Sequence, residues 1–459
     1  MWEIIVASVV TIAVAYFVLK GYQAQATLMG GGMLLMLIAF IFGTGMPLPA
    51  DKSTGSHLLD IFQYMKNTFA EQNAGLGLKI MAIAGFALYM QQVGASAALV
   101  KVLTKPLEKI RHKPYLFMAL CFLVGEFLSI FITSASGLGV LLMVTLYPLM
   151  RGVGLTPLTA CTPIATAVAV EMGPAQGNVN FAADIIGINV VEYVVKYQIL
   201  VSIASLAVIA VLLVIVNKFL DRNTVDTNCD GDDDLNIDDQ TQGTLSKAPT
   251  IYAVLPIIPL VLIFMFNKLT ISSINMDVTT AMFISVVIAL IFEYISLRQG
   301  KKVVNSLQVF FDGMGKQFAT VVTFIVAGQT FAEGLKAIGA IDIIIHSAET
   351  AGFGPIAMTI VMVVIIMVTS ILMGSGNAAF FSFANLVPEI AGRMGIAPVM
   401  MLLPMQFVSG MSRNISPIAP NVVAIAGVAN VSPFTLAKRT AVPMLGGIII
   451  STLISLLTF

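Results

Sequence analysis

The sequence predicts an all-α polytopic membrane protein built as two inverted repeats, each with about five transmembrane spans, a re-entrant hairpin and a broken helix. Three observations predict this fold: an apolar composition, apolar runs of membrane-spanning length, and polar breaks that recur in the same order in both halves. Of the 459 residues, 58% are hydrophobic and 10% are charged, with a mean hydropathy of +0.95. A soluble domain carries about 25% charged residues, so the composition excludes an ordinary soluble enzyme.

The charged residues, cysteines and histidines argue against a nucleic-acid-binding protein, a metal site and a disulfide framework. The 24 basic residues are balanced by 24 acidic ones, which leaves no basic surface for nucleic acid. The three cysteines and three histidines are scattered without ligand-like spacing, so neither a metal site nor a disulfide framework is predicted.

A helix needs about 20 apolar residues to cross the hydrocarbon layer of a membrane. Full-length spans are expected near residues 3–19, 27–43, 76–93, 198–217, 249–267, 278–297, 318–340 and 441–458. Between them, residues 218–248 hold eight Asp and predict an acidic cytoplasmic linker. A calcium loop is the weaker interpretation of this stretch, because the terminal Glu of an EF-hand is absent. The linker divides the chain into a first membrane repeat, 1–217, and a second, 249–459.

The remaining apolar sequence is interrupted by Gly, Pro, Ser and Asn at matching places. A hairpin is expected at about 114–150 and a broken helix at about 155–195, with counterparts at about 355–392 and 398–430. Matching residues are Gly137 and Gly376, Gly154 and Gly395, and Asn178 and Asn421, offset by 239, 241 and 243 positions. The alternative is that helix-breaking residues recur by chance. The offset between matching residues changes by only four positions, from 239 to 243, which favours a duplication.

Charge predicts that the two repeats have opposite orientations. The loop before the first hairpin, 101–113, carries five basic residues, whereas its counterpart, 342–354, carries none. By the positive-inside rule the first loop is cytoplasmic and the second external. The resulting trace has ten spans and both termini in the periplasm, as a multi-pass protein of the bacterial inner membrane.

Inverted repeats with hairpins and broken helices are typical of secondary transporters, whose site lies near the membrane midplane. Helix breaks expose backbone groups, and the N-terminus of a half-helix favours an anion. Arg413 lies in apolar sequence and has the geometry to grip a carboxylate. The predicted binding residues for a small anionic substrate are Ser134, Ser136, Gly137, Gly173, Asn178, Ser375, Gly376, Asn377, Arg413, Ser416 and Asn421. The structural alternative for the small residues is helix packing, and the structural alternatives for Arg413 are an ion pair or snorkelling of its side chain to the membrane surface.

Three acids are candidates for coupling or charge balance. Glu171 lies beside the first break, and three roles are open to it: balancing Arg413, binding a substrate ammonium, or carrying a proton. Glu126 in the first hairpin and Asp184 are candidates for proton coupling, although a cavity-facing or ion-paired acid is equally compatible with either position.

These segments resemble the DcuC family of anaerobic four-carbon dicarboxylate carriers, within a larger superfamily of elevator-type transporters. The resemblance is carried by residues 134–143 and 374–378, by Arg413 with Ser416-Pro417, and by 431–434 with 438–440. It implies uptake, exchange or efflux of succinate, fumarate, malate or aspartate, and a homodimer in the lipid bilayer. Two departures, Glu171 and the pair Gly177-Asn178 where the family pattern is expected to have Gly-Asp, make a zwitterionic substrate more plausible.

We therefore predict a secondary active transporter that works by alternating access and is not an enzyme. A proton or sodium ion is the expected coupling partner, unless the protein exchanges one anion for another, and no cofactor is expected. The main alternative is an amino-acid transporter on the same scaffold. A channel is disfavoured because no ring of charges is visible, and an intramembrane enzyme because no catalytic group is evident in the sequence.

Overall fold

The computed structural model describes residues 2–110, 112–223, 249–267, 270–271, 273–274, 276–341, 343 and 354–459. Every regular element in these residues is a helix, which confirms the all-α fold class. Most of the expected acidic linker, residues 224–248, lies outside the described residues, as does most of the loop 342–354.

The first half of the chain contains α1 to α12. Their bounds are α1 Trp2–Leu19, α2 Ala24–Phe42, α3 His57–Ala74, α4 Leu76–Gln92, α5 Ala95–Thr104, α6 Pro114–Ser129, α7 Ala135–Thr145, α8 Tyr147–Gly152, α9 Pro157–Ala165, α10 Gly177–Ile186, α11 Val190–Tyr193 and α12 Ile199–Asn223. A π-helical turn, Val194–Gln198, joins α11 to α12.

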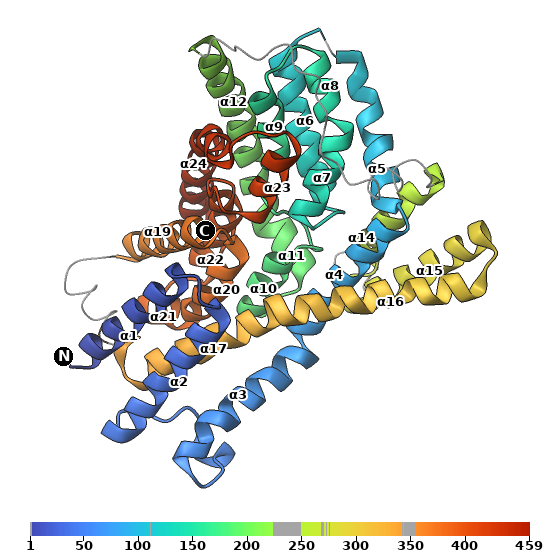
Figure 1. Cartoon of the computed structure of the whole chain (residues 1–459). Coiled ribbons are helices and arrows are strands. Elements are labelled where there is room, and N and C mark those ends of the chain that lie inside the picture. The colour runs from blue at the N-terminus through green and yellow to red at the C-terminus, as the bar shows by residue number, and fades with distance from the viewer. Residues whose placement is uncertain are drawn as a thin grey trace.

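The second half begins with a 3-10 helix, Thr250–Ile257. The helices that follow are α14 Ile258–Met265, α15 Val278–Leu297, α16 Gly300–Gln317, α17 Thr323–Ala337, α19 Pro355–Met373, α20 Gly376–Phe383, α21 Val387–Met394, α22 Val399–Arg413, α23 Pro420–Val428 and α24 Pro433–Thr458. Another π-helical turn, Phe318–Val322, makes α16 and α17 nearly continuous, and Figure 1 shows them as one long yellow-to-orange helix.

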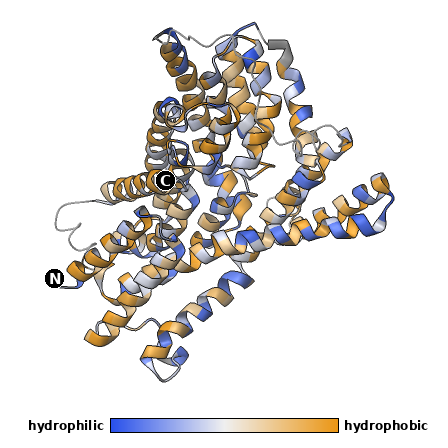
Figure 2. Cartoon of the chain, viewed as in Figure 1, coloured by the Kyte–Doolittle hydropathy of each residue, from blue (hydrophilic) through white to orange (hydrophobic). Residues whose placement is uncertain are grey.

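Six described helical segments are long and apolar enough to cross a membrane, and a seventh is possible if α3 and α4, bent by 49° at Gly75, form one span. The six are α2, α11 with α12, α15, α16 with α17, α19 and α24. The other expected spans consist of shorter helices, so the count of ten and the inverted orientation stay predictions. Large apolar side chains are exposed along α12 and α19, and Figure 2 shows hydrophobic residues along most of both helices, as a lipid-facing surface requires.

One group of helices, which we call the scaffold, comprises α1 to α4 and α14 to α17. Within it α2 packs along α17 and α4 crosses α16. Glycine makes both approaches possible: a Cβ on Gly334 would lie 2.6 Å from the Gly32 carbonyl oxygen, and one on Gly85 would lie 2.6 Å from the Phe310 carbonyl oxygen. Such contacts let backbones meet closely where lipid supplies no hydrophobic force between helices.

The other group, which we call the core bundle, comprises α6 to α12 and α19 to α24. Here α12 packs on α24, and α19 packs on α22. The second arm of each hairpin contacts the broken helix of the other half: α7 packs on α23, and α20 contacts α10. The α20–α10 contact is aromatic, because Phe181 meets Phe380 and Phe381 edge to face with ring centroids 5.8 and 5.0 Å apart. Helices of the two halves thus pack against each other on both sides of the breaks.

Candidate functional site

Two helix breaks lie at the centre of the core bundle. The first separates α9 from α10 over residues 166–176, and the second separates α22 from α23 over residues 414–419. Ten of the eleven residues of the first break are buried, whereas in the second break Asn414, Ser416 and Ala419 are buried and Ile418 is exposed. The first break is therefore enclosed by protein, which is the condition for non-helical chain at membrane depth.

An ion pair joins the two breaks. Arg413, the last residue of α22, lies with a guanidinium nitrogen 2.7 Å from the Glu171 carboxylate of the first break. Its other terminal nitrogen donates to the Val168 carbonyl oxygen at 2.7 Å. The Glu171 side chain is 3% exposed and that of Arg413 is 10% exposed. Because both charges are shielded from solvent, each is stabilised mainly by the other.

In each half, an asparagine at the second position of the helix that follows the break donates to a side chain within the break. The Asn178 side-chain amide donates to the Glu171 carboxylate, and the Asn421 amide donates to the Asn414 side-chain oxygen at 2.7 Å. Within each pair the residues are seven positions apart, and the two pairs are offset by 243, as in the sequence alignment of the halves. Asn421 also donates to the Ala165 carbonyl oxygen at 3.2 Å, which ties the second break to the end of α9.

Two glutamines and a tyrosine complete the enclosure of Glu171. Its backbone has a positive φ of 47°, which is uncommon for a residue other than glycine, and its carbonyl oxygen accepts from Gln198 and Gln406, each at 3.3 Å. Gln198 accepts from the Gly173 N–H at 3.1 Å, and Gln406 accepts from the Tyr193 hydroxyl at 3.0 Å. Neither glutamine belongs to the predicted site, although a glutamine in an apolar segment is itself a signal of a buried polar contact.

Glu126 of α6 lies against the first break. One carboxylate oxygen accepts from the backbone N–H groups of Ala169 at 2.8 Å and Val170 at 3.1 Å. The other oxygen is buried and has no hydrogen-bond partner in the described part of the chain. Asp184, in contrast, is half exposed and lies 3.5 Å from the Lys79 ammonium.

The two hairpin tips use serine in the same way. The Ser134 hydroxyl accepts from the Gly137 N–H at 3.2 Å and caps α7, and the Ser375 hydroxyl accepts from the Ala378 N–H at 3.3 Å and caps α20. These capping residues are 241 positions apart. Ser136 is exposed, whereas the Asn377 side-chain oxygen is buried without a partner among the described residues.

The second hairpin tip fits tightly against α22. A Cβ on Gly376 would overlap the Ser409 carbonyl oxygen. Replacing Gly376 with alanine is therefore expected to destabilise the protein by about 1–3 kcal/mol through overpacking, measured as a lower midpoint of thermal unfolding in detergent. Gly392→Ala is the control, because no atom lies within 4 Å of its added Cβ. Equal midpoints for both variants would contradict the tight contact.

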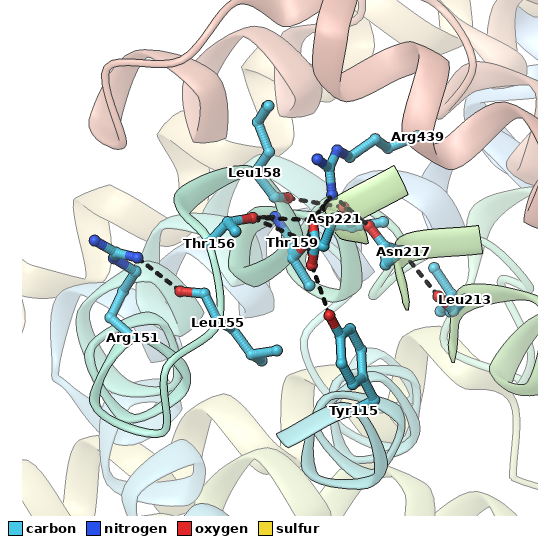
Figure 3. Close-up of polar contacts among 11 residues, drawn as sticks. Tyr115, Arg151, Leu155, Thr156, Leu158, Thr159, Leu213, Asn217, Asp221 and Arg439 are labelled. Atoms are coloured by element: carbon cyan, nitrogen blue, oxygen red, sulfur yellow. Dashed lines mark hydrogen bonds and ion pairs between the residues drawn. The ribbon is translucent and has the colours of Figure 1, made fainter. Parts of the chain in front are cut away.

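A second buried ion pair, outside the predicted site, joins α12 to α24 (Figure 3). A guanidinium nitrogen of Arg439 lies 2.6 Å from the Asp221 carboxylate and donates to the Thr159 hydroxyl at 2.6 Å. Asp221 also accepts from the Tyr115 hydroxyl at 3.0 Å, and Asn217 accepts from Arg439 at 3.3 Å. In the sequence, residue 439 contributes to the family resemblance, and no local pattern indicates this network.

The described residues contain no group of three or more His, Cys, Asp or Glu that could hold a metal ion. The polar atoms at the breaks and tips are amides, hydroxyls, one guanidinium and carboxylates. Such a set can bind and release a small charged solute, since backbone N–H groups and hydroxyls reorganise little when an anion binds.

Comparisons with solved structures agree with this fold. The YdaH transporter of Alcanivorax borkumensis aligns with a TM-score of 0.65 at 17% identity, over 94% of this chain and 97% of that one. MtrF of Neisseria gonorrhoeae, described as one of a class of antimetabolite efflux pumps, aligns with a TM-score of 0.60 at 13% identity, over 94% of each chain. At these identities the likeness concerns the fold alone.

Sequence relatives are closer. A DcuC relative in Vibrio cholerae is 37% identical over 451 residues, 98% of this chain and 96% of that protein. The anaerobic C4-dicarboxylate transporter DcuC of Escherichia coli K12 is 34% identical over 448 residues, 98% of this chain and 95% of that protein. The family model described as DcuC, C4-dicarboxylate anaerobic carrier, matches residues 2–459. The chain, a multi-pass membrane protein with its two breaks locked by a buried ion pair, therefore belongs to the DcuC family of transporters.

Proposed function

We propose that the protein is a secondary active transporter of four-carbon dicarboxylates across the bacterial inner membrane. The structural observation that supports the proposal is the contact between two unwound segments in the core bundle. The relatives that match 98% of this chain are named for four-carbon dicarboxylates. The relatives' names favour dicarboxylates over the amino-acid alternative. Succinate, fumarate, malate and aspartate are the substrates to test.

The proposed site takes its polar atoms from the breaks and hairpin tips. Nine buried side-chain atoms in the described residues lack a hydrogen-bond partner. Five of them belong to residues predicted from the sequence to bind substrate or to take part in coupling: Glu126, Asn377, Arg413, Ser416 and Asn421. Buried polar groups are normally satisfied, so this concentration supports a ligand-binding role. In our proposal, the unpartnered Arg413 nitrogen, the Ser416 hydroxyl and the capped tips at Ser134 and Ser375 bind carboxylates. The unpartnered side-chain oxygens of Asn377 and Asn421 can only accept, so we assign them to a hydroxyl or ammonium group of the substrate.

The proposed mechanism is alternating access by movement of the core bundle against the scaffold. The ion pair between Glu171 and Arg413 and the interlocked hairpins favour movement of the bundle as one body. A dianion alone is strongly disfavoured in a low dielectric, so we propose a co-transported cation, proton or sodium, or an exchanged anion. Glu126, with its unpartnered oxygen, is the proposed proton-binding group. A homodimer with both termini periplasmic is part of the same proposal.

The purified protein in proteoliposomes is expected to take up labelled succinate with saturation and counterflow. Unlabelled fumarate, malate and aspartate should compete, whereas ornithine and arginine should not. Imposing a sodium or a pH gradient separately identifies the coupling ion. Competition by ornithine alone would support the amino-acid alternative, and uptake without saturation would contradict a carrier.

A further inference from the structure

Resting on the proposed function, we propose that Lys316 binds one carboxylate of the substrate in a cavity between the scaffold and the first hairpin. This cavity of about 200 Å³ lies beside the tip of the first hairpin. That volume is more than ten times the ~10–15 Å³ needed to hold one water molecule. Its polar lining residues are Gln91, Ser96, Thr133, Ser134, Lys316 and Gln317.

The electrostatic character of the cavity favours an anion. Of the thirteen described residues that line it, Lys316 is basic and none is acidic. Lys316 is exposed, and unlike Arg413 and Arg439 it has no carboxylate partner in the described ranges. An ammonium in this position presents three donors and a full positive charge to a solute entering the cavity.

Two helix N-termini add to this field. Ser96 is the second residue of α5, and Ser134 with Gly137 forms the capped first turn of α7. All three line the same cavity, so the partial positive ends of two helices lie at its wall. The last turns of α4 and α16 also reach the wall, at Gln91 and Gln317, so Lys316 supplies the main positive charge. Lys316 comes from a third element, α16 of the scaffold. Because Lys316 and the first turn of α7 line the same cavity, we expect a solute with two carboxylates to bind more tightly there than a monocarboxylate.

The two hairpins differ in a way that agrees with this assignment. The tip of the second hairpin is closed against Ser409 and Ile418, since a Cβ on Gly376 or Gly374 would meet their backbone atoms. The tip of the first hairpin borders the cavity. The cavity therefore gives a solute access to the first tip while the second is covered.

Removal of the Lys316 charge tests the inference. Titration calorimetry of the purified full chain with succinate is expected to give a dissociation constant about 10- to 100-fold higher for Lys316→Gln, the usual effect of losing a hydrogen bond to a charged group. Lys316→Arg should restore binding to within about threefold, because it keeps the charge. Lys301→Gln, an exposed lysine on the same helix outside the cavity, should bind as the unmodified protein does. The four-carbon monocarboxylate butyrate should bind weakly to all of these proteins.

The outcomes separate the inference from the proposed function. If the unmodified protein binds and transports succinate and Lys316→Gln binds it equally well, the inference is overturned and the proposed function stands. If the unmodified protein neither binds nor transports any four-carbon dicarboxylate, the proposed function itself fails.

A second measurement locates the ligand without altering a polar group. Ala87 lines the cavity and is partly buried, while the native Cys121 and Cys161 are buried. In a Cys229→Ser background, an Ala87→Cys variant should react with a hydrophilic maleimide, and succinate should slow the reaction at least threefold while butyrate does not. Equal reaction rates with and without saturating succinate would place the ligand elsewhere and overturn the inference.

Discussion

Replacing Arg413 with alanine is expected to destabilise the protein by about 3–5 kcal/mol, because the Glu171 carboxylate would be left charged and buried without its partner. The change would also release the Val168 carbonyl oxygen, which accepts from the same guanidinium. A large fall in the midpoint of thermal unfolding in detergent measures the effect. Lys196→Ala, which breaks an exposed ion pair with Glu192, is the control and should change the midpoint little.

A double variant separates the structural role of Arg413 from substrate binding. Glu171→Gln with Arg413→Gln removes both buried charges, and replacing a whole buried pair is often close to neutral for stability. We expect this protein to recover most of the lost stability but to take up succinate at least tenfold more slowly, since Arg413 has an unpartnered buried nitrogen beside the unwound segment. Normal uptake by a stable double variant would show that Arg413 only locks the breaks together.

The sequence predicted the helical fold because the relevant signals are local. Apolar runs bounded by Gly, Pro and Ser determine where helices begin and end: α6 begins at Pro114 and α19 at Pro355, while Ser134 and Ser375 cap the helices that follow. The predicted spans near 278–297 and 318–340 lie close to α15 and α17. These boundaries depend on neighbouring residues and on membrane thickness, both of which can be read from one sequence.

The partners within the site depended on tertiary packing instead. Glu171 and Arg413 are 242 positions apart, and they meet only because tertiary packing brings the two breaks together. The repeat offset aligned Glu171 with Asn414, and the matched contacts of Asn178 and Asn421 agree with that alignment. No local pattern specified that Gln406 would reach the Glu171 carbonyl oxygen.

The network around Asp221 and Arg439 is the second place where one substitution should have a large effect (Figure 3). Arg439→Gln is expected to destabilise the protein by about 3–5 kcal/mol, because Asp221, 9% exposed at its side chain, would keep its charge without a counterion. Thr159 and Asn217 would also lose a donor. Chemical unfolding of the purified protein, followed by the loss of helical signal, measures the change.

Three variants locate the cause of that loss. Arg222 is exposed and adjacent to Asp221 in the chain. Arg222→Gln should leave stability unchanged, which would show that the loss in Arg439→Gln comes from breaking the buried ion pair and not from removing a positive charge near the end of α12. Arg439→Lys should recover only part of the loss, because one ammonium cannot reproduce the planar fork of the guanidinium. Asp221→Asn with Arg439→Gln should be nearly neutral, because both charges are removed together. If the double variant were as unstable as Arg439→Gln alone, the stabilisation would come from the hydroxyl and amide contacts of this cluster and not from the ion pair.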